Sequence, residues 1–148
     1  MSHYVMDVET LSDCFLVVFE DYKDDTQTYV FTIGLLRNDL KNLLKFLDNN
    51  IKNKEWHISF NGIEFDAQVL QFLLLNRKRL LLLTGEEVAT ILYKKAQDII
   101  ALKNQGKFPT YKESELFIKQ IDVFKINHWD SPAKHLSLKA AQCAMNWY

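Results

Sequence analysis

The stretch HYVMDVETLSDCFLVVFE, residues 3–20, decides the fold of this chain. It contains two runs rich in Val, Phe and Tyr, residues 3–9 and 14–20, separated by the polar residues TLSD. β-Branched and aromatic residues favour strands, and a short polar break between two such runs favours a turn. The stretch therefore predicts that the domain begins with two antiparallel strands.

The residues that follow extend this pattern and then change its period. QTYVFTIG, residues 27–34, predicts a third strand of an antiparallel meander. In residues 37–53 leucines and one isoleucine recur at steps of three and four, which indicates an amphipathic helix. Either Asn38 or Asp39 is expected as its N-cap. A fourth strand is predicted at residues 55–61, ended by Asn61-Gly62.

The second half of the chain is predicted to be mostly helical. Helices are expected at about residues 65–75 and 84–103, the latter with Thr84 as its N-cap and acids in its first turn. A loop at 105–113, a strand at 117–126 and a helix in 136–148 complete the pattern. Strands interleaved with helices predict an α/β fold with a central mixed sheet. Since no repeat or linker interrupts the pattern, we expect a single domain over residues 1–148.

Composition narrows the function classes. The net charge of −1 excludes a strongly basic coat for nucleic acid but leaves a local basic groove open. Cys14 and Cys143 stand alone without CxxC spacing, and no signal peptide precedes the first strand. We therefore expect a reduced, cytoplasmic location. The apolar runs are too short to span a bilayer, so no membrane partner is expected.

Acidic residues follow two of the predicted strands. Asp7 and Glu9 lie two places apart, and residues i and i+2 of a strand share one face. Like charges that close repel unless a proton or a cation lies between them. Asp66 follows the fourth predicted strand, which would neighbour the first, so the three carboxylates are expected to converge on Mg²⁺ or Mn²⁺. The other interpretation of Asp66 is a cap at a helix start.

Three segments resemble a known family in the same order. MDVETL (6–11) and NGIEFDAQVL (61–70) resemble the first two motifs of DnaQ-like 3′–5′ exonucleases, which have an RNase H-like fold. IDVFKINHWDSPAKHLSLKAAQCAMNW (121–147) resembles the segment before the third motif in the proofreading exonuclease domains of phage-type DNA polymerases. The resemblance implies three antiparallel strands followed by parallel strands, flanked by helices. It also implies hydrolysis at DNA 3′ ends by two metal ions, as part of DNA replication.

The resemblance assigns metal-binding and catalytic roles to three residues. Asp7 would bridge both Mg²⁺ or Mn²⁺ ions, and Glu9 would ligate the ion that activates the attacking water. Asp66 would hold the second ion, directly or through water. These three residues are also the expected catalytic residues.

The resemblance also assigns substrate contacts. Thr10 and Leu11 would line the pocket for the terminal nucleotide, and Asn61 and Phe65 would position the penultimate nucleotide and the backbone. The implied partners are single-stranded DNA or a DNA 3′ end, and a polymerase domain or partner. For a phage-encoded protein the location would be the cytoplasm of a bacterial host.

The family's third motif, a Tyr or His followed a few residues later by Asp, does not appear before Tyr148. Asp122 is not expected to replace it, since at this place the family has a strand residue rather than a metal ligand. We therefore expect a C-terminally incomplete domain, either a fragment of a larger exonuclease or polymerase or a truncated relative. The alternative function is a non-catalytic RNase H-like module that binds single-stranded DNA or a polymerase partner.

Two other features have both a structural and a functional interpretation. His57 lies in the predicted strand WHISF with no second residue at metal-ligand spacing, so a core or edge position is expected. Arg77, Lys78 and Arg79 form a basic cluster after the second helix. The cluster is expected to be a solvated helix end, and the other interpretation is a patch that follows phosphates.

Overall fold

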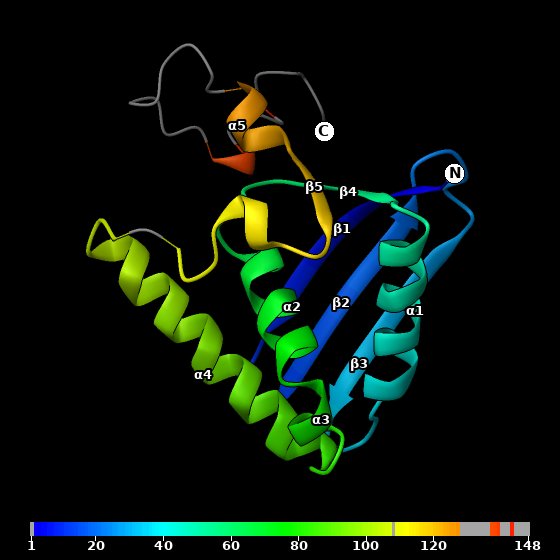
Figure 1. Ribbon diagram of the computed structural model, residues 1–148, viewed down its shortest axis with the longest axis vertical. Helices are drawn as coiled ribbons and strands as arrows, with labels where there is room; N and C mark the ends of the chain where they lie inside the picture. Colours follow the sequence, from blue (N-terminus) through cyan, green and yellow to red (C-terminus); the bar gives the residue numbers. More distant parts are fainter. Residues whose placement is uncertain (1, 108, 128–136, 140–142, 144–148) are drawn as a thin grey trace.

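The computed structural model describes residues 2–107, 109–127, 137–139 and 143 (Figure 1). The elements in chain order are β1 (His3–Thr10), β2 (Cys14–Asp21), β3 (Thr28–Gly34), α1 (Leu40–Lys52), β4 (Trp56–Ser59), α2 (Asp66–Leu75), α3 (Arg77–Leu80), α4 (Gly85–Asn104), η1 (Glu113–Glu115), β5 (Lys119–Asp122) and α5 (Val123–Asn127). The predicted α/β class is confirmed.

The strands form one five-stranded mixed sheet in the order β3-β2-β1-β4-β5. β1 pairs with β2, and β2 with β3, in antiparallel fashion, whereas β1 pairs with β4, and β4 with β5, in parallel. The prediction of three antiparallel strands followed by parallel strands is therefore confirmed. β1, which carries Asp7, is the middle strand of the sheet.

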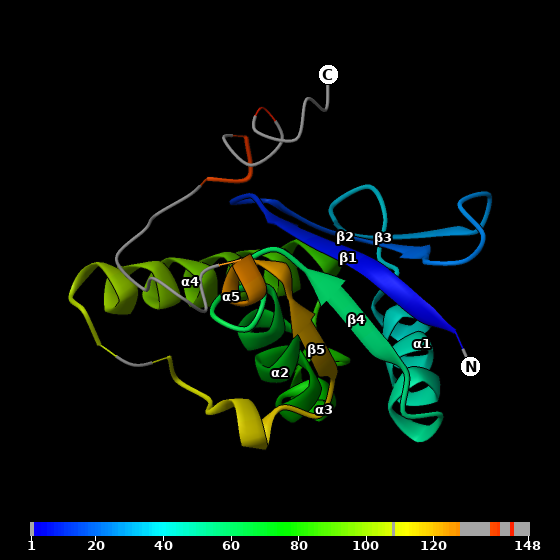
Figure 2. The same ribbon diagram turned by 90° about the horizontal axis from the view of Figure 1, so that it is seen from above.

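The two faces of the sheet differ in their surroundings. Along β1 the side chains of Tyr4, Met6 and Val8 are buried, and those of Val5, Asp7 and Glu9 are exposed. Figure 2 shows α1, α2 and α4 on the same side of β1, β2 and β3. Within the described residues, the helices thus cover one face of these strands and leave the face of Asp7 and Glu9 open.

The covered face holds a core of aliphatic and aromatic side chains. Tyr4, Phe19 and Phe31 from three strands surround Phe46 of α1, and the ring centroids of the contacting pairs lie 4.8–6.3 Å apart. Tilted and edge-to-face pairs of this kind add to the stabilisation from burial. α1 is held to the sheet chiefly through this cluster and its row of buried leucines.

The helix boundaries follow the predicted caps closely. α4 begins after Thr84, whose hydroxyl accepts from the Glu87 backbone N–H at 3.3 Å while its own N–H donates to the Glu87 carboxylate at 2.8 Å. At α1, Asp39 occupies the N-cap position, but its carboxylate accepts from Thr32 N and Arg37 Nε instead of from the helix.

Two predictions about the second half need correction. The strand expected at 117–126 ends at Asp122, because the Asp122 carboxylate accepts from Phe124 N at 3.0 Å and turns the chain into α5. The basic cluster after α2 forms the additional short helix α3. The helix predicted in 136–148 lies mostly outside the described residues. None of the helices in the described ranges is long and apolar enough to cross a membrane.

Candidate functional site

Asp7 and Glu9 share the open face of β1, as their spacing predicted. Both side chains are exposed, and their cross-strand neighbours on β2 are Val18 and Leu16. Two carboxylates therefore lie on the middle strand of the sheet, on the face that α1, α2 and α4 leave uncovered.

Asp66, the first residue of α2, is only 5% exposed, and its Oδ1 accepts from Val8 N at 2.9 Å. β4 ends at Ser59, and its pairing with β1 extends only to Val5, so β4 does not reach the N–H of Val8. A buried backbone N–H requires a partner, and the Asp66 carboxylate supplies it. The start of α2 is therefore bound to β1 between Asp7 and Glu9, and the Asp66 side chain makes a tertiary contact rather than the helix cap of the alternative interpretation.

The electrostatic surroundings of Asp66 are unfavourable to its charge. Burial raises the pKa of Asp66 to about 7, and the neighbouring charge of Asp7 and the weaker influence of Asp122 add to the rise. The hydrogen bond from Val8 N acts in the opposite direction and lowers this pKa. A buried carboxyl that shares its surroundings with a second acid is typical of sites that bind a proton or a cation.

The predicted three-carboxylate cage is only partly assembled. In the part of the chain that the structure describes, no group of three or more His, Cys, Asp or Glu side chains lies close enough together to hold a metal ion. The charge of Asp7 raises the pKa of Asp66, so these two side chains lie near each other. The donors nevertheless fit Mg²⁺ or Mn²⁺ chemically, since carboxylate oxygens are the ligands these ions prefer.

Asn61 lies in the turn between β4 and α2, in the left-handed conformation with φ of 60°. Its N–H donates to Asp122 Oδ1 at 2.8 Å, and its side-chain Oδ1 accepts from Lys103 Nζ at 3.2 Å. Lys103 also pairs with Glu64 at 2.9 Å. No local pattern in the sequence indicates this contact, because Lys103 lies 42 residues away on α4.

The other predicted substrate residues lie at two places. Thr10 is the last residue of β1, and Leu11, 58% exposed, follows it in the turn closed by the hydrogen bond from Leu11 N to Cys14 O. Phe65 is partly buried against the hydrophobic core at the start of α2. The predicted contacts of these residues with nucleotides stay predictions.

The Asp122 carboxylate is buried at the end of β5 and makes several hydrogen bonds to the backbone. It is 4% exposed and accepts from three backbone N–H groups, those of Asn61, Ile63 and Phe124. Asp122 thus joins the end of β5 to the turn that precedes Asp66.

His57 lies in the core, as the sequence predicts. It is 1% exposed, its Nε2 contacts the Asn50 amide at 3.1 Å, and its Nδ1 lies 3.4 Å from the carbonyl oxygen of Lys119. Burial lowers the pKa of His57 to about 4. This histidine is therefore neutral at physiological pH and has a packing role.

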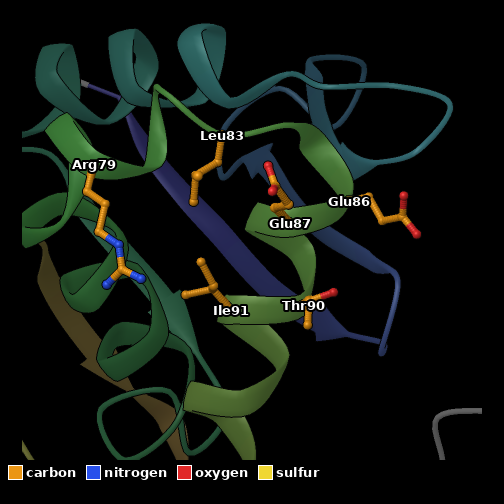
Figure 3. Close-up of a pocket in the computed structure, with 6 residues that line it drawn as sticks. All are labelled: Arg79, Leu83, Glu86, Glu87, Thr90 and Ile91. Carbon is orange, nitrogen blue, oxygen red and sulfur yellow. The ribbon is translucent and has the colours of Figure 1, made fainter.

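The three residues of the basic cluster have different surroundings. Arg77 Nη1 donates to Asp48 Oδ1 at 2.9 Å, whereas Lys78 and Arg79 are exposed. Arg79 lies beside an open pocket of about 460 Å³ between α3 and α4 (Figure 3). The pocket is lined by Arg79, Leu83, Glu86, Glu87, Thr90 and Ile91. None of the residues predicted for the site lines it, and its Glu87 carboxylate already caps α4.

Comparison with known proteins adds no relative. No protein-family model matches the chain, and no curated protein or solved structure matches it significantly.

Proposed function

We propose that this chain is a metal-dependent 3′–5′ exonuclease of the DnaQ-like kind, with an RNase H-like fold. The observation that carries the proposal is the position of Asp66, buried at the start of α2 and bound to β1 between Asp7 and Glu9. Burial beside a second acid disfavours the ionised form of Asp66 in the absence of a cation and raises its pKa to about 7. The strand order, with three antiparallel strands followed by parallel ones, supports the RNase H-like assignment.

Asp7, Glu9 and Asp66 would hold two Mg²⁺ or Mn²⁺ ions in this proposal. When bound, such ions generate hydroxide from water and stabilise the attacking and leaving oxygens of a phosphodiester. Asp66 is held in one orientation by Val8 N, so its second oxygen is positioned before a ligand arrives. Since its pKa is about 7, Asp66 has to give up a proton before it can bind a cation at neutral pH.

Residues on both sides of Asp7, Glu9 and Asp66 would bind the substrate. Leu11 presents an apolar surface just beyond β1, where it would contact the terminal base, with Thr10 beside it. Asn61 and Phe65 would contact the penultimate nucleotide from the turn before α2. The proposed substrate is single-stranded DNA or a DNA 3′ end, in the cytoplasm and next to a polymerase domain or partner.

A non-catalytic module that binds single-stranded DNA or a polymerase partner is the second candidate. It is favoured by the absence, among the described residues, of a group of three side chains close enough together to hold a metal ion. The third exonuclease motif, which would supply one more carboxylate, is also missing from these 148 residues.

The test is degradation of 3′-labelled single-stranded DNA in Mn²⁺. We expect shortening from the 3′ end that Asp7→Asn abolishes, because this change would remove a carboxylate proposed to hold the metal ions. Glu20→Gln is the matched control, since Glu20 is another exposed acid on the same face of the sheet, paired with Val5. DNA binding without any shortening would favour the non-catalytic module, and equal activity in wild type and Asp7→Asn would contradict the exonuclease proposal.

A further inference from the structure

The turn between β4 and α2, residues 61–64, precedes Asp66 and is held by side chains from two distant elements. Asp122 reaches it from the end of β5, and Lys103 reaches it from the last turn of α4. The function proposed above assigns no role to either residue.

Asp122 fixes the backbone of this turn. Its Oδ1 accepts from Asn61 N at 2.8 Å, and its Oδ2 accepts from Ile63 N at 3.2 Å. Both contacts involve a carboxylate that is almost fully buried, where hydrogen bonds to a charged acceptor are strong. Asn61 has a positive φ, a conformation that Asn tolerates better than most residues other than glycine and that is typical of tight turns.

The turn is continuous with the start of α2. The carbonyl oxygen of Gly62 accepts from Phe65 N at 3.3 Å and from Ala67 N at 2.8 Å. A Cβ on Gly62 would lie 2.0 Å from Ser59 Oγ, so the turn also packs tightly against β4. A change in the turn would therefore move Asp66, which lies between the two donors.

Lys103 fixes the side chains of the turn. Its Nζ lies 3.2 Å from Asn61 Oδ1 and 2.9 Å from Glu64 Oε2. Its side chain is half exposed and lines a cavity of about 240 Å³ together with Glu64 and Lys107. Lys103 thus orients the side-chain amide of Asn61, which would contact the nucleotide in the proposed function. The half-exposed ammonium group of Lys103 remains accessible beside that amide.

We propose that Asp122 and Lys103 are positioning residues of the candidate site, with separate effects. Asp122 sets the backbone of the turn and hence the position of Asp66. Lys103 orients Asn61. When single-stranded DNA binds, Lys103 also contacts a DNA phosphate next to Asn61. This inference rests on the proposed exonuclease function.

The kinetic test uses 3′-labelled single-stranded DNA in Mn²⁺. Asp122→Asn should lower kcat about tenfold or more with little change in KM. This is typical of residues that orient a metal-ligating side chain without binding the metal themselves. Lys103→Gln should raise KM and weaken DNA binding with little change in kcat, and Lys103→Arg should restore part of the affinity because it keeps the charge. Asp25→Asn, at an exposed turn, and Lys107→Gln, at the same cavity, are the matched controls. Variants of Asp122 and Lys103 that behave like these controls would overturn the inference.

Hydrogen exchange of backbone amides gives a readout that does not depend on catalysis. In Asp122→Asn the side chain keeps one oxygen for Asn61 N but turns a donor toward Ile63 N, so the Ile63 amide should exchange faster while the fold persists. Unchanged exchange at Ile63 and Asn61 would contradict the role of Asp122, whatever the enzyme does. If the Ile63 amide exchanges faster in Asp122→Asn but the wild-type protein has no nuclease activity, two conclusions follow. Asp122 then positions the turn as inferred, and the proposed exonuclease function is contradicted.

Discussion

Replacing Asp66 by Asn should stabilise the metal-free protein at high pH. The pKa of Asp66 is about 7 in the fold and ordinarily 3.8, so the folded state binds a proton more tightly than the unfolded state. The stability contributed by the protonated carboxyl is full below the ordinary pKa and is lost as the pH rises through about 7. Asn reproduces the neutral form, and its Oδ1 can still accept from Val8 N.

The magnitude follows from the difference between the two pKa values. A rise of this size corresponds to about 4 kcal/mol of folding free energy once the pH is well above 7. Because about 1 kcal/mol shifts the melting temperature of a domain this size by a few degrees, Asp66→Asn should melt about 10 °C above wild type at pH 9. At pH 4 the two proteins should melt within a few degrees of each other.

The assay is a thermal melt at several pH values in the presence of chelator. Asp25→Asn is the control, because Asp25 is exposed and the change should leave the melting temperature unaltered at every pH. If Asp66→Asn melts below wild type at pH 9, the ionised Asp66 is stabilising through its hydrogen bond. The electrostatic account of the site would then be refuted.

Three further predictions concern single side chains. His57, with a pKa lowered to about 4, is protonated more readily when unfolded, so stability should fall by up to about 3 kcal/mol as the pH drops from 6.5 to 4. This loss should be measured by denaturant melts in the Asp66→Asn protein, and equal stability at both pH values would contradict it. Gly62→Ala should destabilise the fold by about 2 kcal/mol or more, because the added Cβ would overlap Ser59. Adding Ser59→Gly to this variant should restore part of the lost stability, and additive losses in the double variant would contradict this packing. Thr84→Ala should cost about 1 kcal/mol in denaturant melts by removing the cap of α4, and a neutral result would contradict the capping role.

The parts of the fold that were predicted correctly depend on local patterns. The three strands of the β1–β3 meander are rich in Val, Phe and Tyr, so their extent is visible in the run of residues 3–34. In β1 and β2 buried residues also occur at every second position. The leucine spacing of α1 likewise indicates the extent of that helix, and the acids after Thr84 indicate where α4 begins. The end of β5 was missed because an apolar run continues past it, whereas the hydrogen bond from Phe124 N to Asp122 marks the change from strand to helix there.

The site was predictable only in part for the same reason. The shared face of Asp7 and Glu9 follows from strand geometry alone. The bond between Asp66 and Val8 N spans 58 residues and depends on where β4 ends, and the contact of Lys103 with Asn61 depends on how α4 crosses the sheet. Such contacts are set by tertiary packing, which no spacing of residue types encodes.

If Asp7 and Asp66 together hold a divalent cation, calorimetric titration with Mn²⁺ at pH 7 should detect its binding. Wild type should bind weakly, since the cage is incomplete, and should release part of a proton as Asp66 ionises, which is seen as a dependence of the heat on the buffer. Binding should disappear in Asp7→Ala and persist in Glu20→Gln. If Asp7→Ala binds Mn²⁺ as wild type does, with the same proton release, the cation binds elsewhere and the joint role of Asp7 and Asp66 is contradicted.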